Sequence, residues 1–293
     1  MPGILEIAGL LLIPAAITAA VAIFSRYFWP ANPHFGLPIA AAVGFAVGCW
    51  SYGDRMPLGP ERHWHWLPYL GLLAALLSNR ASHSRWPVWV WPLSYAVIGV
   101  IAANELTPSY PDLKPARPVL APLMAVYFAL LMWLLSLLPA RLLGTTFVML
   151  LTLVAGGSAL LVASAISLRL GTVALRVPAV LAVCACFAWY ARKPANDEGD
   201  QSESDSDPAL GLIPLYVVLT GGSAYAGATA LPDRWLLLLA PAAPLALWLF
   251  AWGPLARFTG KIAIAVQCVT VLSIVLALLI WFNWPEPETA EWG

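Results

Sequence analysis

Long apolar runs recur from one end of the sequence to the other, and the charged residues are concentrated in the short stretches between them. A helix needs about 20 apolar residues to cross a bilayer, and about 17 at the least. The runs that reach or approach this length are 7–28, 35–50, 64–77, 87–103, 119–138, 146–168, 177–190, 210–230, 235–252 and 262–281. This pattern predicts an all-α fold, a polytopic transmembrane helical bundle of about 8–10 spans. The count is a range because the runs 64–77 and 177–190 are short for full spans.

The composition leads to the same fold class. Of the 293 residues, 61% are hydrophobic and only 10% are charged, and the mean hydropathy is +0.79. A soluble domain carries about 25% charged residues, so a soluble fold of this length could not cover its own apolar surface. Basic and acidic residues number 15 each, which leaves no positive field for nucleic acid. The composition therefore indicates the lipid bilayer as the solvent and excludes a nucleic-acid partner.

Aromatic residues mark the ends of the apolar runs. Tryptophans such as Trp29, Trp50, Trp64, Trp235 and Trp281 lie near these ends, as expected of rings at the level of the lipid headgroups. No basic region precedes the first run, so we interpret it as a retained span and not as a cleaved signal peptide.

Residues 194–208 differ from the rest of the chain, because they are acidic and contain no apolar side chain larger than alanine. We expect a disordered acidic loop between two spans, within a single integral membrane domain that covers residues 1–293. Basic residues divide seven against eight between the two sides of a ten-span arrangement, which leaves the orientation undecided. We expect the plasma (inner) membrane of a bacterium as the location.

Few side chains within the apolar runs could bind a polar ligand. Gln267 is the most polar residue of the last run, and Thr152, Ser158 and Ser164 occupy the sixth. Proton relays and carriers of charged solutes usually hold an ionisable side chain at depth. The scarcity of such residues favours a neutral or amphiphilic solute, bound by hydroxyls, Gln267 and the backbone of interrupted helices.

Two turns of similar sequence precede leucine-rich runs. The first is Pro60-Glu61-Arg62-His63-Trp64 and the second is Pro232-Asp233-Arg234-Trp235. Six predicted spans separate them, so both should lie on one side of the membrane, together with Asp54. Proline, an acidic residue and arginine suit the start of an interfacial helix. The alternative is a gate or a binding surface formed by Asp54, Glu61, Arg62, Asp233 and Arg234.

Metal and cofactor motifs are not recognisable. His63 and His65 offer only two ligands and would diverge on a helix, and the four cysteines all lie inside apolar runs. The sequence contains no phosphate-binding glycine loop with its lysine, no HExxH and no GxSxG. We therefore expect neither a bound metal nor a cofactor.

Three functions are compatible with this pattern. A transporter or channel for a neutral or amphiphilic small solute agrees with the many interrupted spans. A structural or assembly protein, bound to a membrane protein partner, agrees with the scarcity of buried polar residues. A membrane-embedded enzyme acting on lipid would use the acidic and basic residues of the Glu61 and Asp233 turns.

Overall fold

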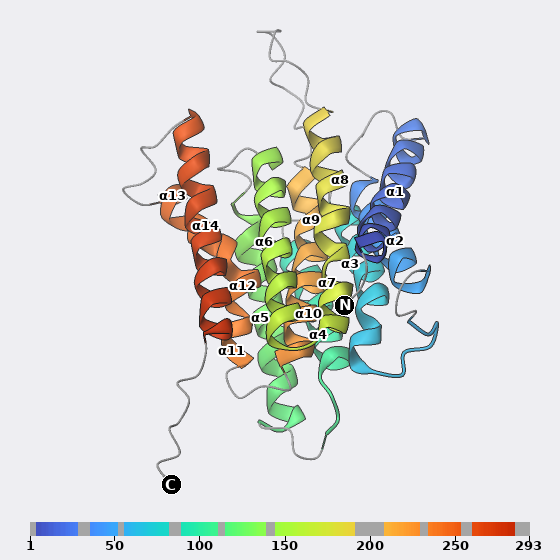
Figure 1. Ribbon diagram of the computed structural model, residues 1–293, viewed down its shortest axis with the longest axis vertical. Coiled ribbons are helices and arrows are strands. Elements are labelled where there is room, and N and C mark those ends of the chain that lie inside the picture. The colour runs from blue at the N-terminus through green and yellow to red at the C-terminus, as the bar shows by residue number, and fades with distance from the viewer. Residues whose placement is uncertain are drawn as a thin grey trace.

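The structure is a computed structural model in which every regular element of the described residues is a helix (Figure 1). It describes residues 4–28, 36–51, 56–81, 89–110, 115–138, 144–190, 208–228, 234–252 and 260–284. The all-α fold predicted from the apolar runs is thus confirmed. The acidic segment 194–208, whose residues up to 207 lie outside the described ones, remains a prediction.

The helices follow the predicted runs closely, and most of them run along the long axis of the molecule. The first half contains α1 (Ile4–Phe28), α2 (Leu37–Ser51), the 3₁₀-helix η1 (His63–Trp66), α3 (Leu67–Ala81), α4 (Val90–Leu106), α5 (Arg117–Ser136) and α6 (Gly144–Ala165). The second half contains α7 (Leu168–Ala174), α8 (Arg176–Tyr190), α9 (Pro208–Tyr216), the π-helical η2 (Val217–Gly221), α10 (Gly222–Ala228), α11 (Arg234–Leu237), α12 (Leu239–Ala242), the 3₁₀-helix η3 (Ala243–Leu247), α13 (Trp248–Trp252) and α14 (Gly260–Asn283).

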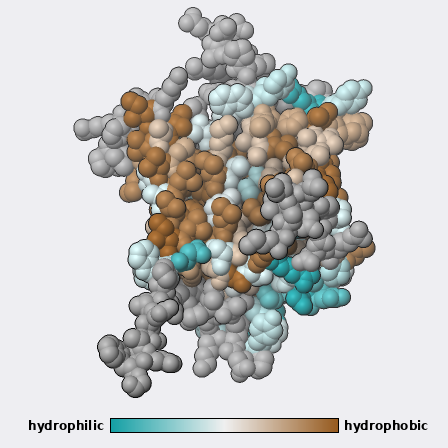
Figure 2. Space-filling model, viewed as in Figure 1, coloured by the Kyte–Doolittle hydropathy of each residue, from teal (hydrophilic) through white to brown (hydrophobic). Residues whose placement is uncertain are grey.

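Six helical segments are long and apolar enough to cross a membrane. They are Ala8–Phe28, Arg117–Ser136, Thr145–Ala165, Leu168–Tyr190, Ala209–Ala228 and Ile262–Asn283. Shorter apolar helices cover Leu37–Ser51, Val90–Leu106 and Trp235–Phe250. Large apolar side chains remain exposed along these helices, for example Leu12, Val126 and Val269, and they form wide apolar areas on the surface (Figure 2). The chain is a multi-pass membrane protein.

The seventh span differs from its prediction. The run 177–190 is short for a full span, but α7 continues it toward the N-terminus. The span is therefore Leu168–Tyr190, with a break at Leu175. Arg176, which the predicted boundaries assign to a connecting loop, therefore lies within the span, about 12 Å along the helix from Leu168. Its side chain is 1% exposed, and Nη1 lies 4.0 Å from the Cys49 sulfur. The prediction that span interiors are nearly free of ionisable residues is wrong at this position.

The helix formed by residues 208–228 is the centre of the bundle (Figure 1). Every side chain position from 211 to 228 is buried, because α9 packs against α2, α3, α5 and α6, while α10 packs against α4, α6 and α7. A helix that is apolar on all sides can be buried in this way. Close packing also joins α1 to α2, where Gly44 lies against the Pro14 carbonyl and Gly48 lies against the Pro14 ring. Gly44 and Gly48, which form a GxxxG pair, thus pack against α1 of the same chain.

The helix directions define two ends of the bundle. At the lower end in Figure 1, α4, α6 and α10 end, while α3, α5, α7 and α11 begin. At the upper end, α1 and α8 end, while α6 and α9 begin. The candidate functional site lies at the lower end.

Candidate functional site

A crevice of two adjoining chambers opens at the lower end of the bundle. The first chamber has a volume of about 330 Å³ and is lined by Pro60, Glu61, Arg62, His63, Trp66, Asn104, Glu105, Thr107, Pro108, Ser109, Tyr110 and Arg117. The second has a volume of about 520 Å³ and is lined by Arg62, His63, Trp64, Tyr110, Ile166, Ser167, Arg169, Leu170, Ala226 and Gly227. Arg62, His63 and Tyr110 line both chambers, so these three side chains form the boundary between them.

The turn before α3 positions Glu61 and Arg62. Arg62 is extended, with φ −127° and ψ 155°, and its carbonyl accepts a hydrogen bond from the His65 amide at 3.0 Å. The backbone amides of Glu61 and Arg62 each donate to Nδ1 of the buried His65 at 3.3 Å. His65 therefore stabilises the backbone from which Glu61 and Arg62 project into the crevice.

His63 connects this turn to the central helix. Its Nε2 lies 3.4 Å from the Ala226 carbonyl oxygen, and its ring meets the Tyr110 ring edge-on with centroids 6.3 Å apart. A carbonyl only accepts, so Nε2 carries the proton in this arrangement. Burial lowers the pKa of His63 below its ordinary value of 6.5, the Ala226 carbonyl partly offsets this, and the Arg62 guanidinium lowers it further. His63 is therefore neutral at pH 7.

The second chamber combines basic and apolar surfaces. Arg62 and Arg169 line it, and none of the described residues that line it is a carboxylate. The Arg169 guanidinium lies over the Trp64 ring at 5.5 Å from the centroid, a stacking that arginine favours. Ile166, Leu170, Trp64 and the backbone around Ala226 supply apolar walls. This arrangement suits a ligand with an anionic head and an apolar body.

The first chamber is more polar and more evenly charged, with two carboxylates, Glu61 and Glu105, beside Arg62 and Arg117. The Arg117 guanidinium is already hydrogen-bonded within the protein. It donates to Ser109 Oγ at 2.6 Å and to the Asn104 carbonyl at 3.0 Å. These bonds hold the start of α5 against the end of α4, so we assign Arg117 a structural role in the wall of the crevice.

The structure brings only some of the predicted site residues together. Glu61 and Arg62 are exposed and line the crevice. Asp54 and Asp233 lie outside the described residues. Arg234 begins α11 at the lower end, where α10 contacts both α11 and η1.

Gln267 lies apart from this group. It is buried in α14, on a helix that packs against α6 and η3. Asn283, sixteen positions further along α14, donates from Nδ2 to Ser164 Oγ at 3.2 Å near the lower end. Gln267 is thus about 24 Å from that end along the helix axis, and it does not line either chamber.

Several residues of the crevice were not identified from the sequence. Arg169, Tyr110, Ser167 and Thr107 line it, yet the sequence marks them only as loop or interfacial residues. For Arg169 a signal did exist, because residues 168–175 remain largely apolar and continue the following run. An arginine inside such a segment is a candidate for a buried or ligand-binding role.

Two buried hydroxyls lie deeper in the bundle. Ser158 in α6 and Thr220 in η2 are each 2% exposed, and their Oγ and Oγ1 atoms have no hydrogen-bond partner among the described residues. Thr220 is about 10 Å along the central helix from Gly227, and Ser158 is about 12 Å along α6 from Ile166. Both hydroxyls therefore lie above the second chamber, toward the middle of the bundle. The other polar residues predicted in α6 are bonded to backbone carbonyls, Thr152 to Val148 and Ser164 to Leu161.

No family model matches the chain, and no match is found among curated proteins or solved structures.

Proposed function

We propose that this multi-pass membrane protein is a carrier for amphiphilic small molecules with an anionic head, and that it binds them in the second chamber. The observation that carries the proposal is the position of Arg62 and Arg169. Both guanidiniums line one chamber of about 520 Å³, together with apolar walls. Volumes of about 300–1,000 Å³ are usual for small-molecule sites.

The charge of the chamber supports an anionic head. Guanidinium groups bind carboxylate, sulfonate and phosphate oxygens through charge-assisted hydrogen bonds. Ser167 and Tyr110 add hydroxyls at the same chamber. The sequence predicted a neutral or amphiphilic solute, and the two arginines support an amphiphilic anion in place of a neutral solute.

The apolar walls support an amphiphile over a small inorganic anion. Ile166, Leu170 and Trp64 would cover an apolar body, and Gly227 allows Ile166 and Leu170 to pack closely against the central helix. Burial of apolar ligand surface contributes about 25 cal/mol per Å². A simple anion would gain none of this energy.

Interrupted helices above the chamber support transport rather than binding alone. The seventh span breaks at Leu175, the central helix contains the π-helical turn Val217–Gly221, and the ninth run is divided into α11, α12, η3 and α13. Carriers commonly place their substrate sites at such breaks. Thr220 and Ser158 would offer hydrogen bonds to a polar head on its way through the bundle.

A structural or assembly role is the second candidate, and the packing of the central helix favours it. All side chain positions from 211 to 228 are buried, as expected of a rigid framework for a partner. A framework needs no ligand, so the two functions differ in a property that can be measured.

The test follows thermal unfolding of the purified protein in a neutral detergent with three naphthalene compounds. These are naphthalene-2-sulfonate, naphthalene-2-sulfonamide and 2-naphthyltrimethylammonium, which share an apolar body and differ in head charge. Ligands that bind only the folded state raise its stability by mass action. We expect the sulfonate to raise the unfolding temperature and the other two to raise it little.

Two variants make the test specific to the site. The test uses the Arg26→Gln protein, because Arg26 lines another apolar groove at the upper end. Sulfonate should stabilise this protein, and adding Arg62→Gln and Arg169→Gln should abolish the stabilisation. Equal stabilisation by all three compounds, or a sulfonate effect that survives in the triple variant, would contradict the proposal. Stabilisation by none of them would favour the structural role.

A further inference from the structure

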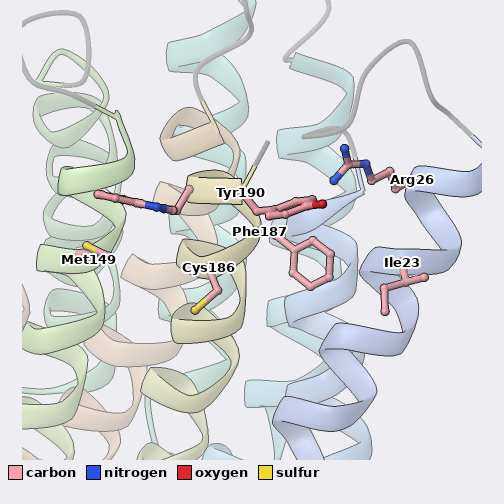
Figure 3. A pocket seen from close by; sticks show the side chains of 7 residues that line it. Ile23, Arg26, Met149, Cys186, Phe187 and Tyr190 are labelled. Carbon is pink, nitrogen blue, oxygen red and sulfur yellow. The ribbon is translucent and has the colours of Figure 1, made fainter. Parts of the chain in front are cut away.

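An apolar groove lies at the upper end of the bundle, where α1 and α8 end. Its volume is about 750 Å³, and it is lined by Ile23, Arg26, Met149, Cys186, Phe187, Trp189 and Tyr190. The side chains come from three helices. Helix α8 packs against both α1 and α6, and it contributes Cys186, Phe187 and Tyr190 between Ile23 of α1 and Met149 of α6 (Figure 3).

One end of the groove is charged and the rest is apolar. Arg26 is the only charged side chain among the described residues that line it. Its guanidinium lies 5.5 Å from the centroid of the Tyr190 ring. Both residues occupy the last turn of their helices, where side chains reach the interface between bilayer and water.

The apolar part of the groove lies one turn deeper. Ile23 precedes Arg26 by three residues, and Cys186 precedes Tyr190 by four, so both are about 5 Å further from the helix ends. The aromatic side chains Trp189 and Tyr190 are 60% and 77% exposed, and Ile23 is also 60% exposed. From the helix ends inward, the cation and the aromatic rings come first and the apolar surface follows, as the phosphate and glycerol of a phospholipid precede its acyl chains.

We propose that this groove binds an anionic phospholipid, with its phosphate at Arg26 and the upper part of an acyl chain between α1 and α6. Arginine is well suited to phosphate because it presents several donors in a planar group. With no carboxylate among the described lining residues, the groove favours a lipid with net negative charge over a zwitterionic one. This site is separate from the proposed carrier function and does not depend on it.

The test is native mass spectrometry of the whole protein, released from neutral detergent, with phosphatidylglycerol or phosphatidylcholine of equal chain length. We expect phosphatidylglycerol to bind about tenfold more tightly, because both lipids offer a phosphate to Arg26 but only phosphatidylcholine brings a trimethylammonium that the guanidinium repels. In the Arg26→Gln variant, the two affinities should become similar. In Arg62→Gln/Arg169→Gln, which alters only the crevice, the preference should remain.

Two further measurements examine the groove itself. Ile23→Trp should fill the apolar part and weaken the binding of both lipids, while inorganic phosphate at millimolar concentration should not displace phosphatidylglycerol. A lipid preference that survives Arg26→Gln, or displacement by inorganic phosphate, would overturn the proposal.

A protein occupant would give a different result. Cys186 is exposed in the groove, whereas Cys49 and Cys184 are buried. In a Cys268→Ser background, mild oxidation should leave the chain monomeric if lipid occupies the groove. Efficient disulfide cross-linking of two copies through Cys186 would mean that this face is a protein interface, and would overturn the lipid assignment.

Discussion

The hydroxyl of Tyr225 on the central helix lies 2.9 Å from the hydroxyl of Thr107 at the end of α4. Thr107 also donates to the Ala103 carbonyl, so Tyr225 is the donor in the bond between the two side chains. Thr107 lines the first chamber, and Ala226, the residue after Tyr225, lines the second. This buried bond therefore fixes the end of α4 to the central helix at the wall of the crevice.

Removing the Tyr225 hydroxyl should weaken this connection. Tyr225→Phe keeps the edge-on contact with Phe128, whose ring centroid is 6.3 Å away, but loses the bond to Thr107. We expect the free energy of unfolding to fall by about 1 kcal/mol, seen as a lower midpoint in thermal unfolding. An unchanged midpoint would show that the bond contributes nothing to the packing of α4.

The contact between α1 and α2 should tolerate no larger side chain at Gly44. A Cβ atom there would lie 2.7 Å from the Pro14 carbonyl oxygen, which is backbone and cannot rotate away. Gly44→Ala should therefore destabilise the protein by about 1–3 kcal/mol. Gly59→Ala is the control, because a Cβ atom at Gly59 meets nothing within 4 Å. Equal thermal stability of the two variants would contradict the packing described for α1 and α2.

Acidification should destabilise the crevice through His63. Because burial holds the pKa of His63 below 6.5 in the folded protein, the unfolded chain binds more protons between the folded pKa and about 6.5. The contribution of neutral His63 to the free energy of unfolding is thus fully present above about pH 6.5. It decreases as the pH falls toward the pKa of His63 in the folded protein. Thermal midpoints measured from pH 7.5 downward should show this decrease, and His63→Gln should reduce it. A decrease of the same size in the variant would assign the effect to other groups.

The sequence predicted the helices of the fold because the lipid bilayer requires the same property of every span. A span must be apolar over a fixed length, and runs such as 119–138 and 262–281 meet this condition without ambiguity. The break at Leu175 was harder to find. There, Arg169 and Arg176 resemble loop residues although residues 168–175 are largely apolar, and the structure joins α7 and α8 into one span that packs against α6.

The crevice could be predicted only in part, because its residues come from distant parts of the chain. Glu61 and Arg62 were identified because their turn resembles the turn 232–235 in sequence. The contact of His63 with Ala226 joins positions 163 residues apart, and no local pattern reveals it. Gln267 was chosen for its polarity alone, but a buried polar side chain can lie on any helix, and this one lies on α14, away from the crevice.

Thr220 offers a way to separate a carrier from a structural protein. Its Oγ1 atom is buried and has no hydrogen-bond partner among the described residues. Thr220→Val retains the shape and removes an unsatisfied polar group, so stability should be unchanged or higher by up to about 1 kcal/mol. If the hydroxyl contacts the head of a passing solute, transport should slow while thermal stability is retained. Unchanged transport would exclude Thr220 from the path.

The most direct test of the carrier proposal is the uptake of naphthalene-2-sulfonate into liposomes that contain the purified protein, followed by its fluorescence. The permanent charge of the sulfonate keeps passive entry slow. We predict uptake above that of protein-free liposomes, its loss in Arg62→Gln/Arg169→Gln and its retention in Arg26→Gln. Uptake equal to that of protein-free liposomes, or uptake that the double variant fully retains, would contradict the proposal that the arginines of the second chamber bind a transported anion.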